Sequence, residues 1–189
     1  MAKVLENAAA LGSGAVPPEL SEPGATGDEL RAALGPILYD INVAQFAPEG
    51  LNFGYFYEHS PIIVTDHETP PDYTMGTITP STVPGCRLPH FVVDGTPILD
   101  LLGPDYTLIR FDAAVDVDPL VNAAATAGLP LIVLDVPRPV DAEVFPTDLV
   151  IVRYDQHVAW RANAAPDDCD ELVATFRGAR TAVRIGTVR

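Results

Sequence analysis

An uninterrupted apolar segment, Leu129 to Val136, constrains the fold of this chain more than any other feature of its sequence. It follows a predicted strand over 106–111 and a predicted short helix over 119–127, which Gly128 ends. A strand, a crossover helix and a continuously apolar second strand are typical of a parallel pair buried on both faces. The sequence therefore predicts a βαβ unit inside a covered sheet.

The residues after this unit predict a hairpin and a closing helix. One expected strand covers 149–154, its return strand 157–160, and the helix 166–177. Gln156 occupies the turn, where glycine is common, and because glutamine resists positive φ we do not expect a tight type I′ turn. Pro146 stands just before the expected strand over 149–154, and we expect a cis peptide bond at Phe145–Pro146. The order βαβ then ββα, with that proline, predicts an α/β, thioredoxin-like domain with a mixed sheet.

The first quarter of the chain is predicted to be an irregular helical extension. Residues 3–11 have the apolar spacing of one helical face, and 12–27 have the glycine- and proline-rich composition of a linker. A second helix fits 27–40, where Pro36 is expected to kink or end it. We therefore assign 1–45 to a helical segment and linker.

The middle of the chain predicts strands and loops. Residues 51–57 are rich in aromatic side chains, as strands are, and 60–64 form a second short apolar run. Residues 66–84 are rich in threonine and proline without periodicity, which predicts a loop. We assign 46–189, including these elements, to the thioredoxin-like domain.

Several motifs in this domain match a known family. A Gly-x-Arg-x-Pro-His segment, an Asp-Gly turn, a Leu-Asp-Leu-Leu-Gly run and a closing hairpin occur at Gly85 to His90, Asp94-Gly95, Leu99 to Gly103 and Val152 to Arg161. Gly54 to Pro61 matches a further family segment. The chain thereby resembles, over nearly its whole length, the C-terminal region of FAD-dependent aromatic-ring monooxygenases of the phenol hydroxylase type.

The resemblance implies a function and a cofactor for the family. Its members use FAD and NAD(P)H to insert one oxygen atom from O₂ into a phenolic or polyketide ring, and their terminal domain is regarded as a non-catalytic packing and dimerisation module. No G-x-G-x-x-G motif occurs in this sequence, so we expect no flavin or nicotinamide site within it. The resemblance places the family's flavin-binding residues upstream of Met1.

Three hypotheses for function follow. The first is a non-catalytic packing or dimerisation domain of an FAD-dependent aromatic hydroxylase, present as a separate or truncated chain. The second is one part of a monooxygenase assembled in trans with a flavin-binding subunit. The third is a free-standing binder of a small ligand that uses the aromatic segment Phe53 to Tyr57. The expected partner is a flavin-binding domain or subunit, or a second copy of the chain.

Candidate site residues are few, and we expect no catalytic, cofactor-binding or metal-binding residue. Arg87, His90 and Trp160 are the candidates for an interface or for pinning a loop. Arg87 and His90 are expected to hold an irregular loop through hydrogen bonds, with Arg87 alternatively pairing with a carboxylate in the chain or on a flavin domain. His157, beside Trp160 in the hairpin, is expected to face outward.

Other chemistries find no support in the sequence. A thioredoxin-like enzyme needs a cysteine where the first helix begins, but Asp112 to Pro119 holds three aspartates and no thiol. We expect these aspartates to cap the helix or face water. The four histidines lack the spacing of metal ligands. Cys86 and Cys169 are expected to be buried or half-exposed thiols rather than a disulfide.

The charge and hydropathy exclude further classes of partner. A net charge of −15 disfavours nucleic acids and anionic membranes, because both would require a basic surface. No apolar run approaches the roughly 20 residues that span a bilayer. We therefore expect no nucleic-acid partner, no membrane association and a cytoplasmic location.

Overall fold

The structure is a computed structural model of the 189-residue chain, described over residues 17–179. It divides into two compact units, Met1–Glu49 with Met75–Thr77, and Gly50–Thr74 with Ile78–Arg189. The helix expected over 3–11 lies outside the described residues.

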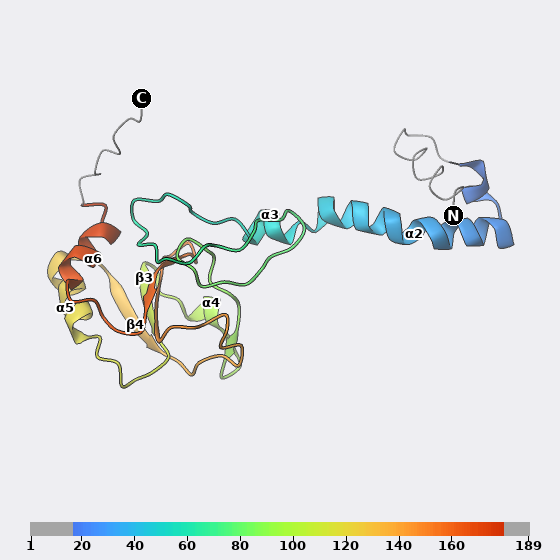
Figure 1. The fold of residues 1–189 in the computed structure, drawn as a ribbon. Coiled ribbons are helices and arrows are strands. Elements are labelled where there is room, and N and C mark those ends of the chain that lie inside the picture. The colour runs from blue at the N-terminus through green and yellow to red at the C-terminus, as the bar shows by residue number, and fades with distance from the viewer. Residues whose placement is uncertain (1–16, 180–189) are drawn as a thin grey trace, which may run out of the picture. The chain divides into compact units, whose positions relative to one another are not determined.

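The first unit contains a 3₁₀ helix, η1 (Pro18–Ser21), and a long helix, α2 (Ala25–Phe46). The helix continues through Pro36 and does not end there (Figure 1). Proline in a helix interior removes one backbone hydrogen bond, and helices that continue past it have other contacts to offset the loss. Leu34, two residues earlier, is a buried apolar residue of this helix.

A four-stranded mixed sheet lies at the centre of the second unit, in the order β4-β3-β5-β6. Its strands are β3 (Tyr106–Arg110), β4 (Leu131–Asp135), β5 (Leu149–Val152) and β6 (Val158–Ala162). Strands β3 and β4 are parallel, whereas β3 with β5 and β5 with β6 are antiparallel. Helix α5 (Asp118–Ala127) connects the parallel pair and α6 (Cys169–Phe176) follows β6. The predicted βαβ and ββα order in a mixed α/β fold is confirmed, and the fold is compatible with the thioredoxin-like class.

Both faces of the sheet are covered, so alternate residues of a strand enter different cores. Leu108 and Ile151 pack with residues of α5 and α6, while Ile109 and Val150 pack against the opposite side. That second side is covered by α4 (Ile98–Leu101) and by a small hairpin of β1 (Val92–Val93) and β2 (Thr96–Pro97). Figure 1 shows α5 and α6 on one side of the sheet and α4 on the other.

Two expectations for the sheet are corrected. Strand β4 is an edge strand with β3 as its sole neighbour in the sheet, and its Ile132 is 43% exposed, so the apolar run is not buried on both faces. The Phe145–Pro146 bond is trans, because the described residues contain no cis peptide bond. Phe145 is nevertheless buried, in contact with the rings of Phe91 and Phe111.

The middle of the chain also differs from the prediction. Residues 51–57 and 60–64 form no strands. A short helix, α3 (Glu49–Phe53), includes residues 51–53, whereas 54–57 and 60–64 have irregular backbone. Single backbone bonds tie this stretch to the sheet region: Tyr57 N–H donates to Gly85 O (3.0 Å) and Val64 N–H to Ala159 O (2.9 Å). The aromatic side chains of this stretch pack against other residues, and their backbone does not form a β-strand.

The aspartates at the helix starts make local contacts. The Asp168 side chain accepts a hydrogen bond from Glu171 N–H at 2.8 Å at the start of α6, and Asp116 accepts one from Asp118 N–H at 3.0 Å. Cys86 and Cys169 are buried free thiols, and burial raises the pKa of both. In the part of the chain that the structure describes, no helix combines the length and apolar character needed to cross a membrane.

Candidate functional site

Two of the motifs singled out in the sequence meet at the edge of the sheet. Gly85 N–H donates to Val158 O (2.8 Å), Val158 N–H donates to Cys86 O (2.9 Å), and Leu88 N–H donates to Gln156 O (2.8 Å). The segment beginning at Gly85 therefore runs antiparallel to β6 and covers its outer edge, which leaves fewer backbone groups unpaired there. This pairing places Arg87 opposite His157, next to the loop of the closing hairpin.

Gly85 permits a third segment to approach. Its φ is +101°, and a Cβ at this position would lie 2.5 Å from the Tyr57 carbonyl oxygen. Only glycine avoids both problems, because it has no Cβ to clash with Tyr57 and it adopts this φ without backbone strain. Tyr57 can therefore hydrogen-bond directly to the backbone of this segment, and residues 53–57 lie beside the hairpin.

The hairpin loop consists of Tyr154, Asp155 and Gln156. Arg153 N–H donates to His157 O at 2.9 Å, and Gln156 N–H donates back to Arg153 O at 2.9 Å. The loop thus has three residues, the last of them left-handed, and is not a two-residue type I′ turn. The absence of a tight type I′ turn was expected, but Gln156 nevertheless adopts a positive φ of +69°.

The side chain of Gln156 has a partner that offsets this backbone cost. Its Oε1 accepts hydrogen bonds from Arg87 Nε, at 3.1 Å, and from an Arg87 terminal nitrogen. The same guanidinium lies over the Phe53 ring, 4.7 Å from its centroid. No carboxylate among residues 17–179 pairs with Arg87, whose positive charge is held by an amide and an aromatic ring.

A second arginine is placed similarly on the other side of the loop. Arg153 pairs with Asp155 at 3.1 Å and lies 5.4 Å from the Tyr57 ring centroid and 5.9 Å from that of Tyr154. The Tyr57 hydroxyl donates to Asp155 Oδ2 at 3.2 Å. Burial, and then the charge and hydrogen bond of Asp155, raise the pKa of Tyr57.

His157 is fully buried, so the expectation that it faces outward is wrong. The rings of Tyr55 and Tyr57 cover it, with centroids 5.0 and 4.7 Å away. Its Nδ1 lies 2.9 Å from Asp155 O, and a carbonyl only accepts, so we assign the proton to Nδ1. The Nε2 atom has no hydrogen-bond partner within residues 17–179.

These groups form an aromatic–arginine surface, defined as Phe53, Tyr55, Arg87, Arg153 and Tyr154. Its rings are solvent-accessible: Phe53 is 44% exposed, Tyr55 45% and Tyr154 67%. Aromatic and arginine side chains are the types enriched in protein interfaces and in their binding hot spots. Hydrolytic or redox chemistry has no evident nucleophile or thiol here, so the arrangement suits binding.

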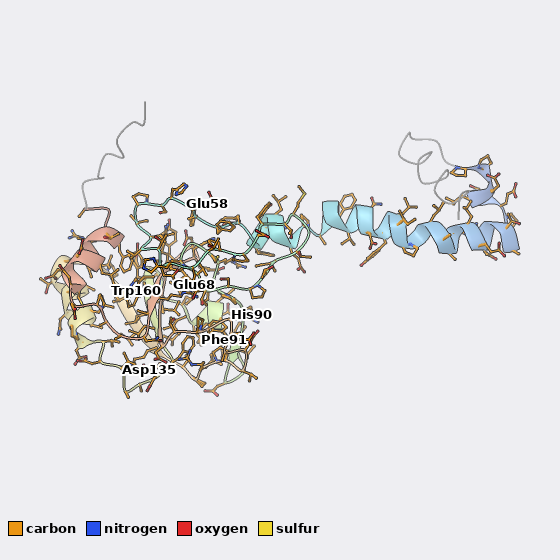
Figure 2. The ribbon with its side chains drawn as sticks, in the orientation of Figure 1. Glu58, Glu68, His90, Phe91, Asp135 and Trp160 are labelled. Carbon is orange, nitrogen blue, oxygen red and sulfur yellow. The ribbon has the colours of Figure 1, made fainter. Side chains whose placement is uncertain are left out.

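The three candidates from the sequence do not gather at one place. Arg87 belongs to the aromatic–arginine surface, whereas His90 is exposed and makes no hydrogen bond within the described chain. Trp160 lies in the core, 8% exposed, beside a cavity of about 270 Å³ next to α6. Figure 2 shows His90 and Trp160 well separated.

Sequence reasoning missed Arg161 as the residue that holds the loop over 66–84. It is buried, and its guanidinium contacts Asp66 at 2.7 Å, Glu68 at 2.7 Å and the Thr82 hydroxyl at 3.0 Å. The Thr82 hydroxyl in turn donates to Val144 O at 2.7 Å. The available signal was an arginine inside an otherwise apolar strand, which requires a charged partner.

Comparison with known proteins identifies relatives. No protein-family model matches the chain. FAD-dependent monooxygenase apdD of Emericella nidulans is 31% identical over 94% of this chain and 30% of its own length, and FAD-dependent monooxygenase opdD of Penicillium oxalicum is 30% identical over 74% and 28%. The chain thus spans less than a third of these curated relatives.

Solved structures give the same relationship. Native and K252c-bound RebC-10x matches with a TM-score of 0.71 and 31% identity, covering 87% of this chain and 32% of that one. The flavin-dependent monooxygenase PieE, in complex with FAD and substrate, matches with a TM-score of 0.65 and 25% identity over 85% of this chain and 31% of its own. Likeness in sequence and in fold therefore extends over most of the chain.

Proposed function

We propose that this chain, which is similar to FAD-dependent monooxygenases over less than a third of their length, corresponds to their C-terminal domain and is a non-catalytic packing or dimerisation domain of an aromatic hydroxylase. The observation that carries the proposal is the aromatic–arginine surface. Three family-like segments, far apart in sequence, build it together. It exposes aromatic rings to solvent, and covering them in an interface would be favourable.

Arg87 supports a protein partner in particular. Its guanidinium has no carboxylate partner among the described residues, and its contacts are Gln156 and the exposed Phe53 ring. An incoming carboxylate from a flavin-binding domain, or from a second copy of this acidic chain, would complete a bidentate pair. Such a pair in the middle of covered aromatic rings is the arrangement of an interface hot spot.

The residues where a dinucleotide would bind in a βαβ unit do not fit FAD. The connection from β3 to α5 contains Asp112 and Asp116 and no glycine, and Asp118 is the first residue of the helix. A pyrophosphate there would meet carboxylates instead of a glycine-rich turn aimed by a helix start. We therefore assign no cofactor contact to this chain and place FAD chemistry in the flavin-binding part of the relatives.

Sedimentation velocity tests the packing role. We expect the purified chain to self-associate and Phe53→Ser or Arg87→Gln to shift it toward monomer, because each removes one half of the cation–π pair. Val140→Ser, a fully exposed position in the same unit, is the matched control and should change nothing. A chain that stays monomeric, and that also forms no complex with a flavin-binding partner, would overturn the proposal.

The second candidate, assembly in trans, shares the same surface and is separated by a different experiment. The chain is mixed with the FAD-loaded part of apdD that it does not match, and gel filtration is followed by flavin absorbance. Co-elution that Arg87→Gln abolishes favours assembly in trans. Retention of FAD by the chain alone would contradict the non-catalytic assignment.

A further inference from the structure

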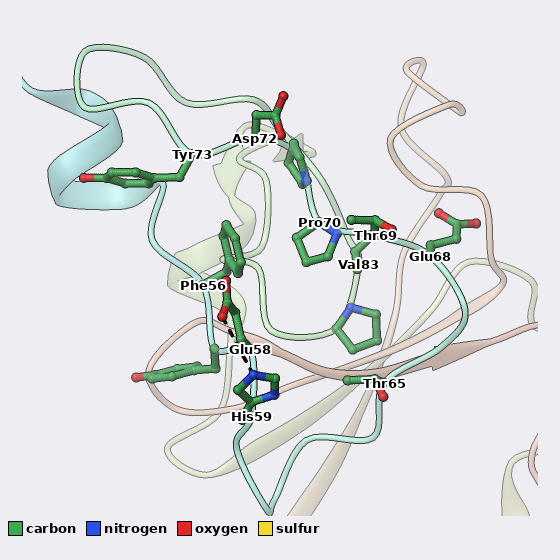
Figure 3. A pocket seen from close by; sticks show the side chains of 13 residues that line it. Phe56, Glu58, His59, Thr65, Glu68, Thr69, Pro70, Asp72, Tyr73 and Val83 are labelled. Atoms are coloured by element: carbon green, nitrogen blue, oxygen red, sulfur yellow. Dashed lines mark ion pairs between the residues drawn. The ribbon is translucent and has the colours of Figure 1, made fainter. Parts of the chain in front are cut away.

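A cavity of about 490 Å³ opens in the second unit, between residues 56–59 and the loop over 68–73 (Figure 3). Its volume lies in the range of small-ligand sites. It shares Tyr57 with the cluster around the hairpin loop but contains no member of the aromatic–arginine surface. The Arg161 contacts described above hold one side of the loop, through Asp66 and Glu68. The loop wall of the cavity is therefore fixed to the sheet.

The walls of the cavity are aromatic and proline-rich. Phe56, Tyr57 and Tyr73 contribute rings, and Pro70 and Pro71 contribute apolar surface between them. Aromatic faces carry partial negative charge and attract weakly hydrated cations, while repelling anions. The walls thus favour an apolar ligand with a positive charge.

The titratable groups of the cavity have the complementary sign. Its lining includes the carboxylates of Glu58, Glu68 and Asp72 and no lysine or arginine. Glu68 shares Arg161 with Asp66, His59 lies 3.9 Å from Glu58, and Asp72 has no ion-pair partner among residues 17–179. Arg161 offsets Glu68, while Asp72 keeps its negative charge in a chain whose net charge is −15.

We infer that this cavity binds an organic ammonium ion, whose alkyl groups contact the rings and whose charge faces Asp72 and Glu58. A metal ion suits the cavity less well, because no group of three or more metal-ligating side chains converges within the described residues. The combination of aromatic walls with carboxylates is instead the recognition chemistry of alkylammonium groups. The inference does not rest on the proposed packing role, since the cavity and the aromatic–arginine surface are different places.

A matched pair of ligands tests the inference on the full chain. Choline and 3,3-dimethylbutan-1-ol have the same shape, but the second replaces the charged nitrogen with carbon. We expect choline to cause saturable shifts of amide signals from residues 56–59 and 68–73 in a ¹⁵N NMR titration. The neutral isostere should bind at least about twofold to fivefold more weakly, as the loss of a cation–π contact implies. Equal binding of both, or no saturable shift with choline, would overturn the inference.

Two variants locate the site. Phe56→Leu removes a ring from the wall and should weaken choline binding by about twofold to fivefold, whereas Phe46→Leu, an exposed phenylalanine on α2, should not. Asp72→Asn removes a charge from a loop without removing an ion pair of the described chain, so the fold should persist, and binding should weaken and lose part of its salt dependence. Asp40→Asn is its control. If the wild-type affinity survives both cavity variants, the cavity is not the site.

Discussion

The hydroxyl of Tyr57 donates a hydrogen bond to Oδ2 of Asp155, a residue 98 positions later, at 3.2 Å. The same tyrosine covers His157 and lies beneath Arg153, and its backbone is bonded to Gly85. One side chain therefore connects the irregular middle of the chain to the hairpin that closes the sheet. The aromatic–arginine surface depends on this connection, since its rings come from both segments.

Removal of the Tyr57 hydroxyl should lower stability measurably. We expect Tyr57→Phe to reduce the free energy of unfolding by about 0.5–1.5 kcal/mol, because Asp155 loses a donor while the ring stays. Urea denaturation measures the change. Tyr154→Phe, in which the ring is 67% exposed, should lie within the error of wild type. Equal effects of the two substitutions would show that the hydrogen bond contributes nothing.

Alanine substitutions at Gly85 and Gly95 distinguish the cost of backbone strain from the cost of a steric clash. Both have positive φ, +101° and +83°, but a Cβ on Gly95 meets nothing within 4 Å, whereas one on Gly85 would meet the Tyr57 backbone. We expect Gly95→Ala to cost about 1 kcal/mol from strain alone and Gly85→Ala about 3 kcal/mol or more, with displacement of residues 53–57. Thermal unfolding of the two variants provides the comparison. A smaller loss for Gly85→Ala would contradict the close approach.

The loop over 66–84 should depend on Arg161. Arg161→Met keeps much of the side-chain volume but leaves Asp66 and Glu68 without their cation, and we expect a loss of about 2–4 kcal/mol. Limited proteolysis should then cut the loop faster. The control, Arg177→Met, changes an exposed arginine without an ion pair in the described chain and should cost less than about 0.5 kcal/mol. Unchanged proteolysis would mean that other contacts hold the loop.

The pair Arg110 and Asp135 predicts a pH dependence. The Arg110 hydrogen bonds lower the pKa of the Asp135 carboxyl, and the same bonds raise the pKa of Arg110. Because the folded-state pKa of Asp135 is depressed, its contribution is present above the ordinary aspartate pKa, near about 4, and is lost as pH falls through the lower folded value. Asp135 is 54% exposed, so solvent screening limits the contribution to less than about 1 kcal/mol.

Urea midpoints at two pH values check this sign. Asp135→Asn should destabilise the chain near about pH 7, and its difference from wild type should shrink as the pH falls toward about 2, because the Asp135 carboxyl of the wild type then takes up its proton. Asp105→Asn, at an exposed position without an ion pair in the described chain, should show no such convergence. A difference that persists unchanged at low pH would rule out the ionic contribution.

The apolar runs and the position of a helix-ending glycine predicted the sheet region well. The apolar runs at β3, β4 and β5, and the left-handed Gly128 at the end of α5, are local signals that the tertiary structure leaves in place. The exposure of β4 was not predictable in the same way, because strand order depends on where the later hairpin pairs. That hairpin joins β3 on its free side and leaves β4 at the edge.

The candidate site was less accessible to sequence reasoning. The family-like motifs marked Arg87, but Phe53 and Tyr55 resembled a strand, because aromatic residues that pack on a histidine have the same composition as a half-buried strand. The role of His157 depends on two rings that precede it by about a hundred residues. No periodicity reports such a contact, and only the fold brings these side chains together.

The fluorescence of Trp160 reports on the second unit. Trp160 is the single tryptophan of the chain, and it lies on β6 in the core cluster that includes residues of α6, within the unit formed by Gly50–Thr74 and Ile78–Arg189. Its fluorescence therefore follows the loosening of the sheet core, whereas α2, the longest helix of the described residues, contributes to the helical signal in circular dichroism. Recording both probes in one denaturation experiment would reveal whether the two units unfold as one cooperative system.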